Sequence, residues 1–247
     1  CVQVRTGQGR ACLNKMGANM VIPQWVQLAS IGMLLLGLAC ALYMAWQMKR
    51  TPPNMAVMRF VWPLCAMFAG PLLILFYNRY AGPDAGEAPF AAKVAKGTLH
   101  CGAGCSLADL LCENAAHYLP GVLALFGLGT IFSTEIFAQW TMDYVFALLI
   151  GIVFQYFAIA PMRDLSVSEG IKAATKADVL SLTSWQVGMY GFMGLSHFVL
   201  FPAVFGGTVD AGSPVFWAAM QIAMLAGFAT AYFPNWWLIR FGLKEEM

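Results

Sequence analysis

Two thiols and an imidazole lie within six residues near the middle of the chain. The run from His100 to Cys105 reads HCGAGC, and its two glycines give the backbone unusual conformational freedom. Thiolate and imidazole groups are ligands that Cu(I) and Zn(II) prefer in proteins. The Cys-x3-Cys spacing differs from the Cys-x2-Cys of zinc knuckles and thioredoxin-like motifs, so the chemistry is less specific. The run predicts a soft-metal or thiol site, and the competing interpretation is a tight glycine turn with incidental thiols.

The two cysteines begin a series of polar residues with a period of four. Its members are Cys101, Cys105, Asp109, Glu113 and His117. Residues four apart share one face of a helix, so these side chains are expected to line up if the segment is helical. An ionisable group costs roughly 2.5 to 3.5 kcal/mol inside a bilayer on the insertion scale, and such groups are usually functional there. With His100, the series predicts an entrance that captures an ion and passes it, or protons, inward.

A second set of soft ligands occurs in two later apolar segments. They are Met189, Met193, His197, Met220 and Met224. Facing methionines in a dry helical bundle suit a monovalent copper ion, because sulfur ligands prefer it. The competing interpretation is packing, because methionine fills gaps in protein cores and the chain contains 15 of them.

Composition indicates a membrane protein. The chain is 60% hydrophobic and 11% charged, whereas typical globular domains are about 25% charged. A bilayer core of about 30 Å requires roughly 20 apolar helical residues, and six segments satisfy this length. They run approximately over residues 24–48, 55–77, 106–132, 141–160, 178–201 and 214–232. The sequence therefore predicts an all-α integral membrane protein, a bundle of about six transmembrane helices.

The remaining segments give more detailed expectations. Residues 1–20 are predicted to be a polar tail before a single membrane domain over residues 21–247. Residues 78–100 are expected to be a polar loop, after which Ser106 to Asp109 has the form of a helix capping box. Residues 162–177 are charged and amphipathic, which predicts an interfacial helix on the membrane surface. Asp143 and Asp178 lie near expected helix N-termini, where the helix dipole favours a carboxylate, so both are interpreted as structural.

Charge counting predicts the orientation. With six spans, the loops after the first, third and fifth carry only three of the fourteen lysines and arginines. The positive-inside rule then places both termini and the His100–Cys105 loop in the cytoplasm. Thiols stay reduced there, which favours metal or thiol chemistry over a structural disulfide.

Four stretches resemble an uncharacterised bacterial membrane family, the domain-of-unknown-function family 4396. They are His100–Cys105, Phe154–Arg163, Asp178–Tyr190 and Phe216–Trp237. The resemblance covers roughly residues 97–247. It implies a multi-helix protein of the bacterial inner membrane, and it implies no particular activity, substrate or catalytic residue.

These patterns together predict a protein that binds a soft metal ion and transports or delivers it across the membrane. Cu(I) is the preferred ion and zinc is the alternative. The expected partners are the lipid bilayer, a metal donor or acceptor protein, and a second copy or a larger membrane complex. The net charge is only +2 and no nucleophilic triad or phosphate loop occurs, so neither nucleic-acid binding nor hydrolysis is expected.

Two other functions remain open at this level. Cys101 and Cys105 could cycle between dithiol and disulfide and exchange electrons with a quinone, since a helix N-terminus lowers the pKa of a nearby thiol. A structural or assembly subunit of a larger membrane complex is the third possibility. It would tolerate serine at both cysteines but not enlargement of the small-residue helix faces.

Overall fold

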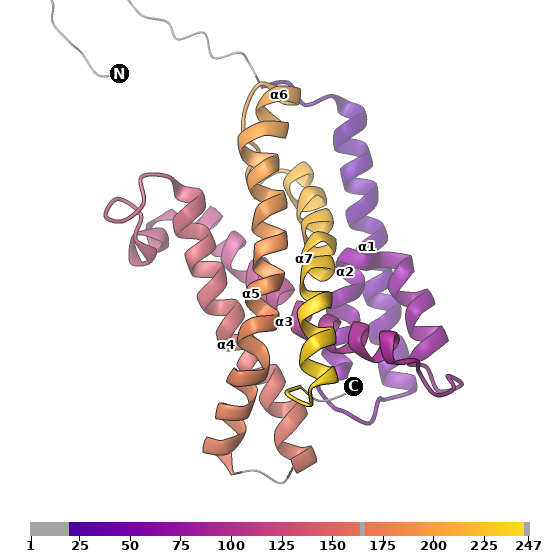
Figure 1. Ribbon diagram of the computed structural model, residues 1–247. Helices are drawn as coiled ribbons and strands as arrows, with labels where there is room; N and C mark the ends of the chain where they lie inside the picture. Colours follow the sequence, from indigo (N-terminus) through magenta and orange to yellow (C-terminus); the bar gives the residue numbers. More distant parts are fainter. Residues whose placement is uncertain (1–19, 164–165, 245–247) are drawn as a thin grey trace, which may run out of the picture.

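The computed structural model describes residues 20–163 and 166–244, and these residues form a helical bundle (Figure 1). The elements are α1 (Gln24–Arg50), α2 (Met58–Tyr80), α3 (Phe90–Tyr118), the 3-10 helix η1 (Pro120–Phe126), α4 (Glu135–Arg163), α5 (Val167–Leu195), the π-helix η2 (Ser196–Leu200), α6 (Phe201–Phe205) and α7 (Pro214–Arg240). The all-α prediction is confirmed. The polar tail predicted over residues 1–20 lies outside the described residues except for Met20.

Five helical stretches in the described part of the chain are long and apolar enough to cross a membrane. They are α1, α2, α4 up to Ala158, the continuous run from Val167 to Phe205, and α7. Five of the six expected spans therefore have a counterpart, with different boundaries. The exception is the third, which was expected over residues 106–132.

The expected boundaries of that third helix were wrong. α3 begins at Phe90, well before Ser106, and ends at Tyr118. Ser106 lies in mid-helix, where its hydroxyl donates a hydrogen bond to the Gly102 carbonyl at 2.8 Å, so no capping box forms there. The run from His100 to Cys105 is helical and buried rather than part of a polar loop. Residues 119–134 contain η1 and a tight turn in which Gly127 has a positive φ of 94°.

The glycines of α3 allow close packing rather than a turn. A methyl group at Gly102 would collide with the Trp185 ring of α5, and a methyl group at Gly104 would lie 3.3 Å from the Gly151 Cα of α4. Small residues at helix contacts let helices approach closely in membrane proteins. α3 contacts α2, α4, α5 and α7, and most of its residues from Ala92 to Cys105 are buried. This polar helix is therefore enclosed by apolar ones.

α2 is divided by a sharp bend. Gly70 has φ 53° and ψ −133°, a conformation that glycine adopts readily, and Pro71 follows it. Backbone groups freed by such a break need other partners in a membrane. Gln221 of α7 supplies one of them, since its Nε2 donates to the Met67 carbonyl at 2.6 Å.

The separate interfacial helix predicted over residues 162–177 is not found. Residues 167–177 are the first three turns of α5, and the helix continues without interruption past Asp178. Residues 164 and 165 lie outside the described residues. A capping box occurs here instead of at Ser106, since the Ser166 backbone N–H donates to Glu169 Oε2 at 3.2 Å. The Glu169 carboxylate thus accepts a hydrogen bond from a backbone N–H at the start of α5 that has no partner within the helix.

The two described ends of the chain lie at opposite ends of the bundle (Figure 1). The Val21 N–H donates to the Phe205 carbonyl at one end, whereas Lys244 bonds to Asn235 near the end of α7 at the other. Six spans would bring both ends to the same side of the bundle. α3, an enclosed polar helix, is not among the five helical stretches of the described chain that are long and apolar enough to cross a membrane.

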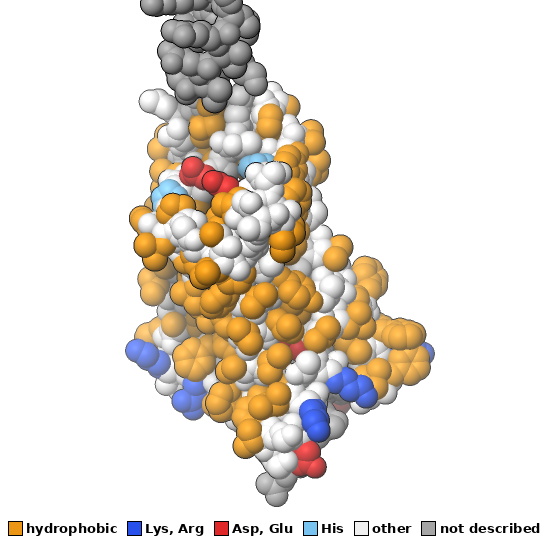
Figure 2. Space-filling model, turned by 90° about the vertical axis from the view of Figure 1, so that its left-hand side faces the viewer, with side chains coloured by type: hydrophobic (Ala, Val, Ile, Leu, Met, Phe, Trp, Pro, Cys, Tyr) orange, Lys and Arg blue, Asp and Glu red, His pale blue; other side chains and the backbone are white. Residues whose placement is uncertain are grey.

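Lysine and arginine residues gather near the end of the bundle where the described chain finishes. They lie in the last turn of α1 (Lys49 and Arg50), the first turn of α2 (Arg59), the first three turns of α5 (Lys172 and Lys176), and the end of α7 and the residues after it (Arg240 and Lys244). On the face drawn in Figure 2, every blue side chain lies in the lower half. Red side chains lie beside the pale-blue histidines in the upper half and also beside the blue side chains at the lower tip. We call the lysine-rich and arginine-rich end the basic end.

The contact between Gly102 and Trp185 gives a test of this packing. Gly102→Ala should lower the free energy of unfolding by about 1 to 3 kcal/mol, because a methyl group overpacks the contact between α3 and α5. The control is Gly191→Ala in α5, where a Cβ meets nothing within 4 Å. Thermal unfolding of both variants in detergent measures the difference. Equal stability of Gly102→Ala and the wild type would contradict the enclosure of α3.

Candidate functional site

The polar series predicted with a period of four lies entirely within α3. Cys101, Cys105 and Asp109 are each at most 1% exposed, and Glu113 is 9% exposed. His117 lies in the last turn and is exposed. The series therefore leads from the middle of the bundle to the surface, along a helix that other helices cover.

The two thiols at the inner end of the series lie beside each other. The Cys101 and Cys105 side chains are within hydrogen-bonding reach, and Cys101 also faces the Asp178 carboxyl group of α5. A third thiol is close, because Cys65 of α2 donates to the Leu99 carbonyl at 3.2 Å. All three are free cysteines. The thiols are thus in the core and not at an entrance, which corrects the expected position of the capture site.

His100 does not belong to the row of polar side chains that runs along α3 from Cys101 to His117, which we call the polar line. Its side chain is 1% exposed, its Nε2 has no hydrogen-bond partner, and its ring packs edge-on against Phe154 of α4 at 6.2 Å between centroids. It is one residue removed from Cys101 and so points from a different side of α3.

Further along, α4 contributes a carboxylate that the sequence analysis interpreted as structural. Asp143 is 1% exposed and accepts a hydrogen bond from Gln139 Nε2 at 2.8 Å. It lies close enough to Asp109 and Glu113 for their charges to interact. Because α4 begins at Glu135, Asp143 lies in its third turn, too far from the N-terminus for the dipole interpretation. Only the packing of α4 on α3 brings these carboxyl groups together.

Asp178 is the second residue that the sequence analysis undervalued. α5 begins eleven residues earlier, at Val167, so Asp178 is also far from a helix N-terminus. Its carboxyl group is buried without a hydrogen-bond partner and lies directly against Gly151, where a methyl group would collide with Oδ2. The side chain therefore continues the polar line from Cys101 towards the basic end.

Lys244 closes the line at the basic end. The side chain is 3% exposed, and its Nζ donates to Asn235 Oδ1 at 2.7 Å and to Ser181 Oγ and the Gly97 carbonyl at 3.4 Å. Asn235 Nδ2 donates in turn to Ser181 Oγ at 2.6 Å. The ammonium group is near enough to Asp178 to interact with its charge. A buried cation held mainly by neutral oxygens thus separates the polar line from the exterior at this end.

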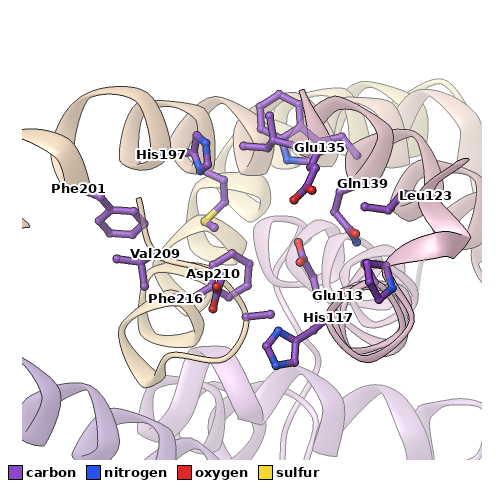
Figure 3. Close-up of a pocket in the computed structure, with 16 residues that line it drawn as sticks. Glu113, His117, Leu123, Glu135, Gln139, His197, Phe201, Val209, Asp210 and Phe216 are labelled. Carbon is purple, nitrogen blue, oxygen red and sulfur yellow. The ribbon is translucent and has the colours of Figure 1, made fainter. Parts of the chain in front are cut away.

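At its other end the line opens into a pocket of about 260 Å³. Its ionisable lining residues are Glu113 and His117 from α3, Glu135 from α4, His197 from η2 and Asp210 from the loop before α7. Figure 3 shows the carboxyl groups of Glu113, Glu135 and Asp210 directed towards the same space. No lysine or arginine is among the lining residues. The pocket is therefore an anionic vestibule, and we use that name below.

The predicted thioether set also faces the interior. Met189, Met193, Met220 and Met224 are each at most 6% exposed and belong to the same hydrophobic core as Cys101 and Cys105. The Ser106 hydroxyl of α3 lies 3.7 Å from the sulfur of Met224, which places this methionine beside the polar helix. Met193 and His197 line the anionic vestibule. Sulfur atoms of α5 and α7 therefore accompany the polar line of α3.

The ligands are arranged along a path rather than around a point. Within residues 20–163 and 166–244, no group of three or more histidine, cysteine, aspartate or glutamate side chains could hold a metal ion as it stands. Successive donors instead occur about one helical turn apart on α3, roughly 6 Å. Such spacing suits a series of weak sites more than one tight site.

The fold and this path define a helical protein with several candidate membrane spans and a buried polar line through its centre. The chain belongs to the family described as Domain of unknown function (DUF4396), which it matches over residues 92–244. This confirms the resemblance noted in the sequence. No curated protein and no solved structure matches the chain. The matched segment contains α3, the anionic vestibule, Asp178 and Lys244, so its function has to be argued from these residues.

The role of Lys244 in closing the basic end can be tested by its stability effect. Lys244→Met keeps the length of the side chain but leaves Asn235 Oδ1 without its donor, so the free energy of unfolding should fall by about 1 to 3 kcal/mol. Lys172→Met, at an exposed position of α5 near the same end, should have no such effect. Denaturant unfolding in detergent compares the two. An unchanged stability of Lys244→Met would show that the lysine does not hold this end together.

Proposed function

We propose that this protein transports a cation across the bilayer along the polar face of α3, with Cu(I) as the preferred cargo. The observation that carries the proposal is the unbroken order of Cys101, Cys105, Asp109 and Glu113 on an enclosed helix that ends in the anionic vestibule. Ionisable groups at such positions are costly and mark ion paths in membrane proteins. Zinc is the alternative cargo.

The order of the donors suggests how the path would select its ion. Carboxylates in the vestibule attract any cation and raise its local concentration at the mouth. Deeper in, Cys101, Cys105 and the four methionines offer sulfur donors, which prefer a soft monovalent metal to Na⁺, K⁺ or Mg²⁺. Transport needs binding that is strong enough for entry and weak enough for release at each step. Donors separated by one helical turn meet that requirement.

The charge distribution supports an orientation for this transport. Membrane proteins carry their lysine and arginine excess on the cytoplasmic side, so the basic end would face the cytoplasm of the bacterial inner membrane. The anionic vestibule would then face the opposite side and receive the ion. In this orientation Lys244 lies at the exit. Its ammonium group and the transported cation would both be attracted to the Asp178 carboxyl group. Release to a cytoplasmic acceptor protein would require Lys244 to move aside.

The cysteine pair provides the first functional test. Cys101→Ser combined with Cys105→Ser should reduce Cu(I) uptake by reconstituted vesicles at least tenfold, because hydroxyl groups bind soft metals poorly. Cys40→Ser is the control, since Cys40 is also a buried thiol but lies on α1, away from the path. Uptake is measured as vesicle copper under reducing conditions. If the double variant took up copper as fast as the wild type, the thiols would have no part in transport. If the wild type itself took up no copper, copper transport would be refuted.

The anionic vestibule provides a separate test. Glu135→Gln combined with Asp210→Asn should raise the cation concentration needed for half-maximal uptake several-fold, because two attracting charges are lost. The maximal rate should change little, since neither residue lies on α3. Glu87→Gln, at an exposed position between α2 and α3, serves as the control. In right-side-out vesicles the vestibule should face the medium. An effect confined to inverted vesicles would reverse the proposed orientation.

A thiol–quinone enzyme is the second candidate, because Cys101 and Cys105 lie side by side in the core. Their oxidation to a disulfide would release two electrons and two protons, which reduce a quinone to a quinol. The same double variant distinguishes this function from transport, since it would lose quinone reduction while copper uptake would be absent in both proteins. If the protein were a structural subunit, neither the wild type nor the double variant would show copper uptake or quinone reduction.

A further inference from the structure

A groove on the flank of the bundle has a composition unlike that of the anionic vestibule. It encloses about 850 Å³ and is lined by residues from α1 to α4. The lining residues are Ala45, Met48, Lys49, Pro52, Arg59, Phe60, Pro63, Leu64, Leu107 and Phe154. Eight of these ten side chains are apolar, and the other two are cations. The groove is therefore amphipathic, with a single sign of charge.

The two cations lie together at the basic end. Lys49 is in the last turn of α1 and Arg59 in the first turn of α2, and only a short loop separates these helices. Both side chains are exposed. No aspartate or glutamate is among the lining residues, so the groove itself contains no counter-charge. Any occupant that neutralises both side chains has to bring its own negative charge.

The rest of the groove is suited to a hydrocarbon. Phe60 and Leu64 of α2 follow Arg59 in the lining, together with Leu107 of α3 and Phe154 of α4. Leu64, Leu107 and Phe154 are half-buried, whereas Phe60 is exposed. These positions lie between candidate membrane spans, where no water is available to fill an apolar space. An acyl chain packed against these side chains would make van der Waals contacts with them and fill the space in the groove.

We propose that this groove binds one anionic phospholipid from the leaflet at the basic end. Lys49 and Arg59 contact its phosphate group, and one acyl chain lies along Phe60, Leu64, Leu107 and Phe154. Basic residues next to a membrane span attract anionic lipids, by an amount that corresponds to about fivefold in affinity for each charge. A neutral quinone would leave both cations unmatched, and inorganic phosphate would leave the apolar walls uncovered.

The occupant would also touch the wall of the polar line. Phe154 packs edge-on against His100, whose neighbour Cys101 faces Asp178. A lipid chain against Phe154 would therefore hold the ring that closes this side of α3. The lipid site does not depend on the proposed transport, since it rests on the charge and shape of the groove alone.

Binding can be measured by titration of the delipidated protein in detergent with dioleoylphosphatidylglycerol, followed by native mass spectrometry. Lys49→Gln combined with Arg59→Gln should weaken binding of this lipid by about 25-fold and leave the weaker binding of dioleoylphosphatidylcholine unchanged. Lys172→Gln combined with Lys176→Gln is the matched control, because it removes two exposed charges from α5 near the same end. The control should bind like the wild type.

A second variant tests the apolar part. Leu107→Trp should fill the groove and reduce phosphatidylglycerol binding although both cations remain, and circular dichroism would verify that the variant is folded. Equal losses in the Lys49/Arg59 and Lys172/Lys176 variants would mean general charge attraction and would overturn the site. Competition by inorganic phosphate, or a co-purified isoprenoid quinone in place of phospholipid, would overturn the assigned occupant.

Discussion

The constraint on which this structure depends is the need to keep a polar helix away from lipid. α3 carries three thiols, an imidazole and two carboxyl groups on residues that are almost completely buried. A bilayer offers these groups no hydrogen-bond partners, so other helices must surround them. Gly102 and Gly104 make this enclosure feasible, because they let Trp185 and Gly151 come into direct contact with the α3 backbone. The positions of these two glycines thus determine where the polar side chains of α3 lie in the bundle.

Enclosure also explains why charge is distributed so unevenly. The interior of the bundle holds carboxyl groups from three helices, Asp109, Asp143 and Asp178. Among the described residues, the one buried lysine is Lys244, which follows α7. The path is therefore lined by acidic side chains and thiols, open at the anionic vestibule and closed by Lys244 at the basic end. The same end carries the two cations of the lipid groove. The proposed cation path and the proposed anionic-lipid site both rest on this separation of acidic and basic side chains along the bundle axis.

The candidate site illustrates how a helix can combine two kinds of ligand. Carboxylates interact with cations through charge and discriminate little among them, whereas sulfur atoms discriminate strongly but attract weakly at a distance. Here the carboxylates lie nearer the vestibule and the thiols nearer the centre, with buried methionines of α5 and α7 beside them. In the proposed transport, this arrangement would separate collection of an ion from its selection, which a single compact metal site would not do.

The sequence alone determined the all-α fold, most of the candidate membrane spans and the period-four series on α3, because all of these depend on local periodicity and hydropathy. It could not determine where α3 begins, since the glycines at positions 102 and 104 suit a turn and a tight helix contact equally well. The roles of Asp143 and Asp178 were also hidden, because a carboxylate becomes part of a path only through neighbours from other helices. Tertiary structure decided these points, together with the position of Lys244, for the same reason: each is a contact between residues far apart in the chain.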